Sequence, residues 1–168
     1  MAAPRLALSV QYGTASANVP SRSQFRRWVR KALERDARIT IRVVGAAEGR
    51  ALNRGYRGRD YATNVLTFVL HGEPPYEGDL AICAPVVARE AREQGKDLAA
   101  HYAHLTVHGV LHLQGYDHEN EADAALMEDR EAKIVMALGY PHPYAERTAL
   151  PARRTGGRRT AASESHVR

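Results

Sequence analysis

The sequence predicts a single domain of the α/β or α+β class, and three observations support this. The chain has 168 residues, which is enough for one domain with a substantial hydrophobic core. Hydrophobic residues make up 44% of it and charged residues 26%, a balance typical of folded rather than disordered proteins. Short segments rich in apolar or β-branched residues alternate with longer segments of helical periodicity, which is the pattern of a sheet layered with helices.

The first half of the chain alternates strands and helices. We expect a strand at 5–13, a helix at 21–36, a strand at 38–44, a short helix at 45–58 and a strand at 64–70. The helix at 21–36 begins at Ser21 or Ser23, either of which can cap it. It places Phe25 and Trp28 on an apolar face and arginines on the other. The segment 64–70 is almost wholly apolar, which predicts a central strand.

The second half begins with a turn-rich loop and is then mainly helical. We expect this loop at 71–78, a strand at 79–83, and helices at 84–96, 97–115 and 119–139. Pro85 suits the first turn of the first helix, and Gly95 its end. Asp97 is the expected N-cap of the second helix, and Gly115 follows its last turn. Gly139 ends the third helix.

Charge is divided unevenly along the chain. Residues 1–59 hold 13 basic and 3 acidic side chains, whereas residues 60–146 hold 5 and 15. Twelve of the 13 basic residues are arginines, whose guanidinium groups fork onto phosphate. This asymmetry indicates a polyanionic partner for the first half. The alternative interpretation is a solvated basic helix face.

The chain divides into a folded domain at 1–146 and a tail at 147–168. The tail carries six arginines and one glutamate, and Leu150 and Val167 are its only larger apolar residues. Such a segment cannot bury enough surface to offset the entropy of ordering, so we expect disorder. No apolar run approaches the roughly 20 residues that span a bilayer, and Cys83 is the only cysteine. We therefore expect a cytoplasmic protein with no membrane partner and no disulfide-linked partner.

The segment HGVLHLQGYDH, residues 108–118, predicts a metal site. His108 and His112 lie four residues apart on the expected helix and so share one face of it. Gly115 lets the chain leave the helix, and the short GYDH segment can bring His118 back to the pair. Three imidazoles with an open fourth position are typical of a catalytic zinc site. Nickel and cobalt also accept such ligands. A neighbouring histidine, His104, is expected to support the site or to lie on the surface.

The metzincin proteases use the same histidine spacing, but they carry a glutamate directly after the first histidine as the general base. This chain has Gly109 there. A peptidase built on this motif would therefore lack its proton shuttle.

The segment HLTVHGVLHLQGYDH closely resembles the signature of the YbeY family of metal-dependent endoribonucleases. The likeness extends to LNRGYRGRDYATNVLTF at 52–68, EGDLAICAPVVAREAREQGK at 77–96 and LGYPHPY at 138–144, and covers roughly residues 5–144. The chain departs from the family at Ala62, where proline is frequent, and at Gln114, where an apolar residue is common. It also has TFV at 67–69, where the family often has SFP.

The resemblance implies a small α+β domain with a mixed four-stranded sheet packed with helices. It implies that His108, His112 and His118 bind one zinc ion and that Arg57 is the functional arginine. The implied activity is cleavage of single-stranded RNA, in maturation of the 3′ end of small-subunit ribosomal RNA and in ribosome quality control. Ribosomal RNA, the small ribosomal subunit and assembly factors are then the expected partners.

The remaining roles are hypotheses drawn from the residues. The arginines of the helix at 21–36 are expected to hold the RNA backbone: Arg22, Arg26, Arg27 and Arg30. Asp117 is expected to orient a histidine through its second ring nitrogen, with Asp60 and Asp79 as alternatives. Arg57 is otherwise a surface arginine in a glycine-rich turn. Two other functions stay open, a zinc peptidase and a non-catalytic ribosome-assembly factor that uses metal for stability.

Overall fold

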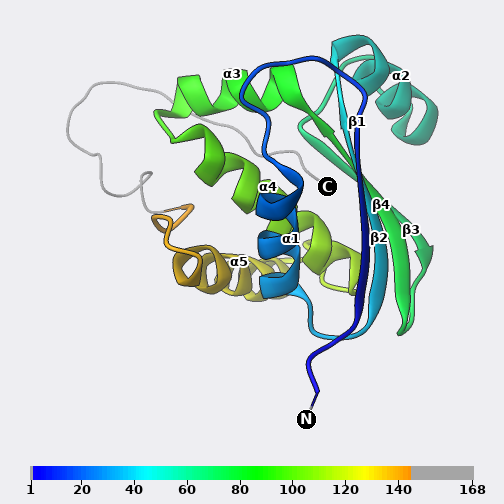
Figure 1. The fold of residues 1–168 in the computed structure, drawn as a ribbon, viewed down its shortest axis with the longest axis vertical. Helices are drawn as coiled ribbons and strands as arrows, with labels where there is room; N and C mark the ends of the chain where they lie inside the picture. Colours follow the sequence, from blue (N-terminus) through cyan, green and yellow to red (C-terminus); the bar gives the residue numbers. More distant parts are fainter. Residues whose placement is uncertain (1, 145–168) are drawn as a thin grey trace.

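A mixed four-stranded sheet is the centre of the fold, in a computed structural model that describes residues 2–144 (Figure 1). The tail predicted at 147–168 lies outside the described residues. The strands are β1 (Leu6–Tyr12), β2 (Ala37–Val44), β3 (Val65–His71) and β4 (Tyr76–Cys83). Their order is β1-β2-β4-β3. The pairs β1–β2 and β2–β4 are parallel, and β3 runs antiparallel to β4. This confirms the expected α+β domain with a mixed sheet.

The strand predicted to be central, β3, is in fact an edge strand. Val65, Leu66 and Thr67 are buried, whereas Val69 and Leu70 are exposed. The apolar run reflects burial of its first half beneath helices, not a place between two strands. The predicted loop at 71–78 is also shorter than expected, because His71 pairs with Glu77 in the β3–β4 ladder.

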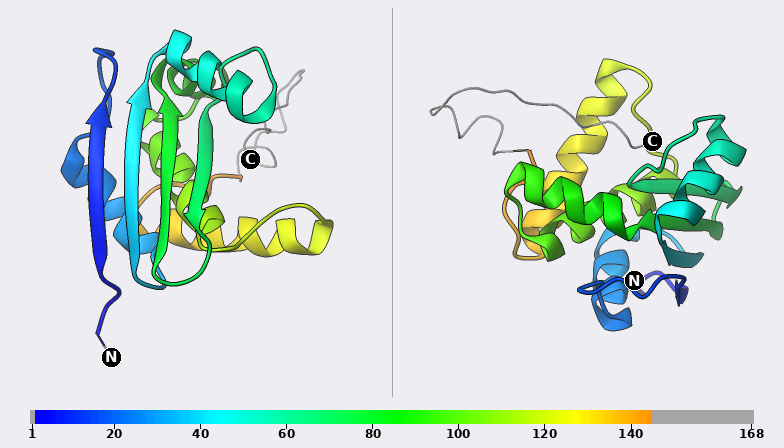
Figure 2. Two further views of the ribbon diagram at one scale, coloured as in Figure 1. Left: turned by 90° about the vertical axis from the view of Figure 1, so that its right-hand side faces the viewer. Right: turned by 90° about the horizontal axis from the view of Figure 1, so that it is seen from above.

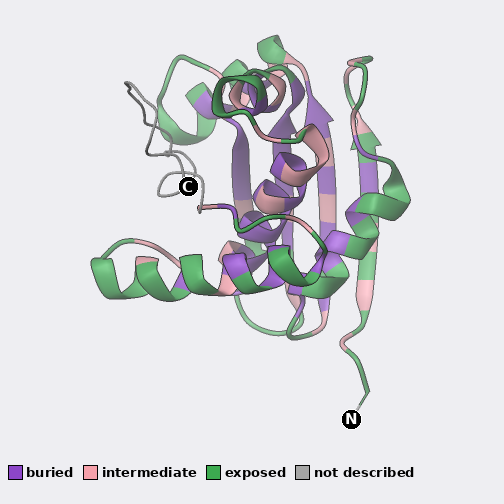
Figure 3. Ribbon diagram, turned by 90° about the vertical axis from the view of Figure 1, so that its left-hand side faces the viewer, coloured by how far each residue is buried: buried purple, intermediate pink, exposed green. Residues whose placement is uncertain are grey.

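Five helices complete the domain. They are α1 (Arg22–Ala32), α2 (Ala46–Arg57), α3 (Ala84–Gln94), α4 (Leu98–Leu113) and α5 (Glu121–Ala137). Four of them, α1, α3, α4 and α5, cover one side of the sheet, and α2 lies at the sheet's upper end on the other side (Figure 1). Seen from the side of these four helices, much of the sheet behind them is coloured as buried in Figure 3. No helix within residues 2–144 is long and apolar enough to cross a membrane.

The helix α4 is the centre of the helical layer. Eleven of its 16 residues are buried, as expected for a helix that contacts neighbours all round. It packs against α1, α3 and α5 as well as against β3 and β4. The core beside it contains Phe25 and Trp28 of α1, both fully buried, which confirms the apolar face predicted for that helix. Cys83 is also buried.

The helix ends show why these segments begin and stop where they do. Ser21 caps α1 in a capping box with Gln24, and Asp97 caps α4 through the amide of Ala100. Gly58 and Gly95 adopt left-handed conformations after α2 and α3, where a side chain is disfavoured. The helix α1 ends four residues earlier than predicted, because Leu33 is already extended.

Candidate metal centre

Two of the predicted metal ligands lie on the last two turns of α4. His108 and His112 are four residues apart and therefore project from one face of the helix. Gly115, with a φ of 103°, reverses the chain just after the helix. The connection to α5 then carries His118, as the glycine spacing predicts. In Figure 2 this connection extends beyond the β3 edge of the sheet.

The three imidazole rings gather at one place. The ring centroids of His108 and His118 are 5.7 Å apart, and those of His112 and His118 are 6.2 Å apart. The rings are nearly parallel, at 28° and 29°. Within residues 2–144 no three His, Cys, Asp or Glu side chains have their donor atoms arranged as a finished metal-coordination sphere. The structure thus brings the predicted residues together in adjoining positions rather than in coordination geometry.

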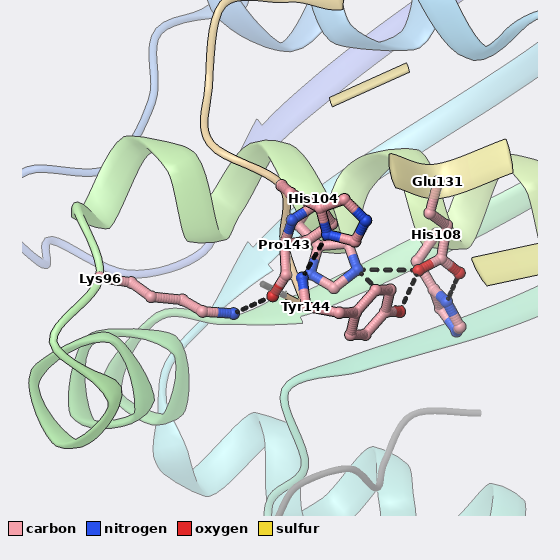
Figure 4. A network of polar contacts seen from close by, with 7 residues as sticks. Lys96, His104, His108, Glu131, Pro143 and Tyr144 are labelled. Carbon is pink, nitrogen blue, oxygen red and sulfur yellow. Dashed lines mark hydrogen bonds and ion pairs between the residues drawn. The ribbon is translucent and has the colours of Figure 1, made fainter. Parts of the chain in front are cut away.

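A buried carboxylate holds the first histidine. Glu131 of α5 is fully buried, and its Oε2 lies 2.5 Å from Nδ1 of His108. The other oxygen, Oε1, lies 2.8 Å from Nε2 of His104 and accepts a hydrogen bond from the hydroxyl of Tyr144 (Figure 4). Burial alone would raise the pKa of this carboxyl, but its contacts with the rings of His108 and His104 hold that pKa well below its ordinary value. Glu131 is therefore an ionised acceptor.

The same contact prepares His108 for a metal. An ionised carboxylate only accepts, so Nδ1 of His108 carries the proton and Nε2 keeps its lone pair. This Nε2 is buried and has no hydrogen-bond partner among the described residues. A buried nitrogen lone pair without a partner is costly unless something binds it. Since the carbonyl of Tyr116 lies 3.1 Å from Nδ1 of His112, the same reasoning leaves Nε2 of His112 as an acceptor. These donor atoms fit a divalent transition metal.

Gly109 faces the sheet and not the histidine cluster. A Cβ atom at this position would lie 2.6 Å from Cδ2 of Leu80 and 2.9 Å from its Cγ. Such contacts are too close for any side chain unless the buried Leu80 side chain or the backbone shifts. A glutamate at 109 would need this space, so the protease arrangement does not fit here.

The predicted arginine, Arg57, comes from a different element. It lies at the last position of α2 and is exposed. Its neighbour Tyr56 packs its ring 4.4 Å from that of Phe68 on β3. Thr67, the adjacent residue of β3, faces Gly109 of α4. Because successive strand residues point to opposite faces, α4 and the end of α2 lie on opposite faces of β3. Arg57 and the histidines are therefore carried by elements on opposite faces of β3, the edge strand.

The predicted carboxylate partners have other positions. Asp117 accepts a hydrogen bond from the backbone amide of Glu119. Asp60 pairs with Arg50 at 2.7 Å and with Arg54 at 3.1 Å. Asp79 is opposite Phe68 in the β3–β4 ladder, and paired residues share a face, so it lies on the side of the sheet away from α4. The contact expected of Asp117 is made to His108 by Glu131.

The predicted RNA-binding arginines divide into two groups. The guanidinium of Arg22 donates to the carbonyl of Val10 and lies 4.9 Å from the centre of the Tyr12 ring. Arg26, Arg27 and Arg30 instead line a pocket beside the end of α5.

The residues that sequence reasoning missed are Glu131 and Tyr144. Glu131 had a visible signal, because it stands between Met127 and Ile134 on the face of α5 that is buried. An acidic residue on an apolar helix face requires a partner. Tyr144 had no comparable signal. His104, left open between support and surface, supports the site through Glu131.

Comparisons with known proteins identify the family of this chain. The profile of the family described as Endoribonuclease YbeY matches residues 11–139. The Endoribonuclease YbeY of Thiobacillus denitrificans is 60% identical over 144 residues, covering 84% of this chain and 98% of that protein. That of Methylobacillus flagellatus is 58% identical over 141 residues, with 84% and 95% covered. The solution structure of TM1509 from Thermotoga maritima superposes with a TM-score of 0.57 at 25% identity, over 88% of this chain and 99% of that one. This chain therefore belongs to the endoribonuclease YbeY family.

Proposed function

We propose that this chain is a zinc-dependent endoribonuclease that cleaves single-stranded RNA. The family membership makes it an RNA-cleaving hydrolase with a role in ribosomal RNA processing, within a family of metalloenzymes. The proposal adds the metal, the residues and the substrate form. It places the enzyme in the cytoplasm with the small ribosomal subunit and its assembly factors, in 3′ end maturation and ribosome quality control.

The observation that carries the proposal is the state of His108. Its Nδ1 is held by a buried carboxylate, and its buried Nε2 has no partner among the described residues. Two further imidazoles adjoin it. We propose that His108, His112 and His118 bind one zinc ion through these rings. When bound, zinc would polarise a phosphoryl oxygen and lower the pKa of a water molecule.

The chain's own residues would orient the metal-binding histidines and stabilise the negative charge that develops during the reaction. Glu131 keeps the His108 ring in one tautomer and one orientation, and the Tyr116 carbonyl does the same for His112. Arg57 would fork onto the phosphate and stabilise the negative charge that grows in the transition state. Asp117, next to His118 in the chain, would orient a histidine through its second ring nitrogen.

The arrangement also suggests where the RNA lies. The histidines and Arg57 flank β3 from opposite faces, so a substrate that reaches both must cross the free edge of that strand. Tyr56 and Tyr61 are both about half exposed on the Arg57 side, and exposed aromatic rings can stack on unpaired bases. A single strand suits this path, because its bases are free to stack.

The two alternatives fit the structure less well. A peptidase would need a base after His108, and Gly109 has no room for one. A non-catalytic assembly factor that uses metal for stability would also occupy this nitrogen, but structural zinc sites usually close with four protein ligands, whereas three histidines gather here.

The test compares His112→Ala, Arg57→Lys and Asp117→Asn on a labelled single-stranded RNA. We expect His112→Ala to abolish cleavage and zinc binding. Arg57→Lys keeps the charge but loses the fork, so we expect about a 10²-fold loss in kcat with unchanged zinc content. Arg92→Lys is the matched control, because Arg92 is also an exposed arginine in the last turn of a helix. Cleavage at the wild-type rate by His112→Ala would overturn the proposal.

A further inference from the structure

A basic pocket lies between α1 and the C-terminal end of α5. Its volume is about 490 Å³. The lining residues are Ser23, Arg26, Arg27, Arg30, Lys31, Ala137 and Leu138. Those of α1 follow the spacing i, i+3, i+4, i+7 and i+8, and so form one stripe along the helix. The opposite stripe of α1 contains Phe25, Trp28 and Val29 and is buried.

The four cations of this pocket are not neutralised. Within residues 2–144, none of Arg26, Arg27, Arg30 and Lys31 forms an ion pair with a carboxylate. Arg27 donates to the carbonyl of Leu138, and Arg30 donates to that of Pro4. These bonds hold the side chains in place and leave most of the five guanidinium donors of each arginine available.

Other arginines of the basic first half are already paired. Arg42 forms a forked pair with Glu48, and Arg50 and Arg54 both pair with Asp60. The α1 stripe therefore holds part of the positive charge that this half can offer to a ligand. Four converging cations at close range favour a multivalent anion.

The pocket is separate from the histidine cluster. It lies at the end of α5, whereas the connection that carries His118 precedes the first residue of that helix (Figure 2). With 17 residues, α5 is about 25 Å long. Glu131, which contacts His108, lies about 10 Å along the helix from Leu138.

The lining identifies the chemistry of the ligand. Forked guanidinium groups and a hydroxyl match phosphate oxygens. The only apolar lining residues are Ala137 and Leu138, so the pocket has no aromatic ring on which a base could stack. A site of this kind reads the phosphate backbone without reading sequence.

We propose that this pocket is a second RNA-binding site, which holds backbone phosphates of the substrate away from the place of cleavage. The inference rests on the proposed function for the identity of the substrate as RNA. It adds Lys31 and Ser23 to the predicted RNA contacts and leaves out Arg22, which does not line the pocket. The site contributes affinity and salt dependence, not chemistry.

The experiment uses the full chain with R26Q/R30Q/K31Q. Arg27 is retained because it contacts the end of α5. The control R89Q/R92Q/K133Q removes the same charge from exposed positions on α3 and α5. Binding of a long and a short single-stranded RNA is measured by fluorescence anisotropy from low to moderate salt. Each phosphate contact to a single strand contributes about 0.7 to the slope of log K against log salt. We expect the pocket variant to lower that slope by about 1 to 2 for the long RNA and the control to leave it unchanged.

The outcomes separate this inference from the proposed function. An unchanged slope in the pocket variant overturns the inference, even if the enzyme cleaves RNA normally. If the pocket variant lowers the slope but the wild-type chain does not cleave RNA, the RNA-binding pocket is supported and the proposed endoribonuclease activity is overturned. Polyglutamate is a probe for an acidic protein partner. If the wild-type pocket binds polyglutamate while the variant binds RNA as the wild type does, the inference is overturned in favour of such a partner.

Discussion

Glu131 places an ionised carboxylate in the middle of the helical layer with none of its surface exposed. It contacts two histidines of α4 and the hydroxyl of Tyr144. Both oxygens therefore have partners, which offsets the cost of removing a charge from water. One side chain thus links α4, α5 and the end of the described chain at the candidate metal centre.

Replacing Glu131 with glutamine should lower the affinity for zinc, while the domain still folds. Glutamine keeps the shape but loses the charge, and its amide nitrogen cannot accept from a histidine. We expect zinc affinity to fall about 10–100-fold, measured by competition with a chelating dye. The control is Glu128→Gln, an exposed glutamate of the same helix. Equal zinc affinity in both variants would show that Glu131 does not position a ligand.

Gly109 shows how far residue-level prediction reaches. The missing glutamate was visible in the sequence and argued correctly against protease chemistry. The reason was not visible, because Leu80 and Thr67, which close the space, are far from Gly109 in sequence. Histidine spacing gives a helix face and a turn, but the partner of each ring is set by tertiary contacts.

At the scale of elements, most segments could be predicted from periodicity and capping residues. The position of β3 could not. Apolar content reports that a strand's side chains are buried, and helices on both faces bury the first half of β3 as effectively as neighbouring strands would. The error matters for function, because the free edge of β3 separates the histidines from Arg57.

Gln114 connects two elements in a way that explains its unusual identity. Its side-chain oxygen accepts from the amides of Glu34 and Arg35, at 2.8 and 3.3 Å, and its nitrogen donates to the carbonyl of Ala32 at 2.9 Å. These are backbone groups at and just after the end of α1, where helices leave carbonyls unpaired. A buried amide therefore fixes the turn from α1 to β2 against the end of α4.

The variant Gln114→Leu should destabilise the domain by about 2 kcal/mol, because three backbone groups lose their partners. The change should appear as a lower urea midpoint with an unchanged slope of the unfolding free energy. Gln94→Leu, at an exposed position on α3, should leave the midpoint where it is. Equal midpoints for the two variants would mean that solvent or a backbone shift satisfies these groups.

At the scale of the whole molecule, charge counts predicted a polyanionic partner but not the surface to which it binds. Residues 1–59 hold ten more basic than acidic side chains, yet ion pairs within the fold neutralise several of them. Charge counts do not show which cations are paired, whereas the fold does: Arg50 and Arg54 of α2 both pair with Asp60 in the loop that follows that helix. Part of the surplus that remains lies on α1, next to the end of α5.

The fold as a whole should survive removal of its metal. The core is built from the sheet and from the helices α1, α3, α4 and α5, with large buried side chains such as Trp28, Tyr102 and Ile41, and the histidine cluster lies to one side of it. Dialysis against a chelator should therefore leave the far-ultraviolet circular dichroism spectrum intact and stop RNA cleavage. Zinc should restore cleavage and raise Tm, since a ligand of the native state stabilises it by mass action. His112→Ala should show no such rise. Unfolding on chelation would instead make the metal structural, and cleavage that continues without metal would remove zinc from the mechanism.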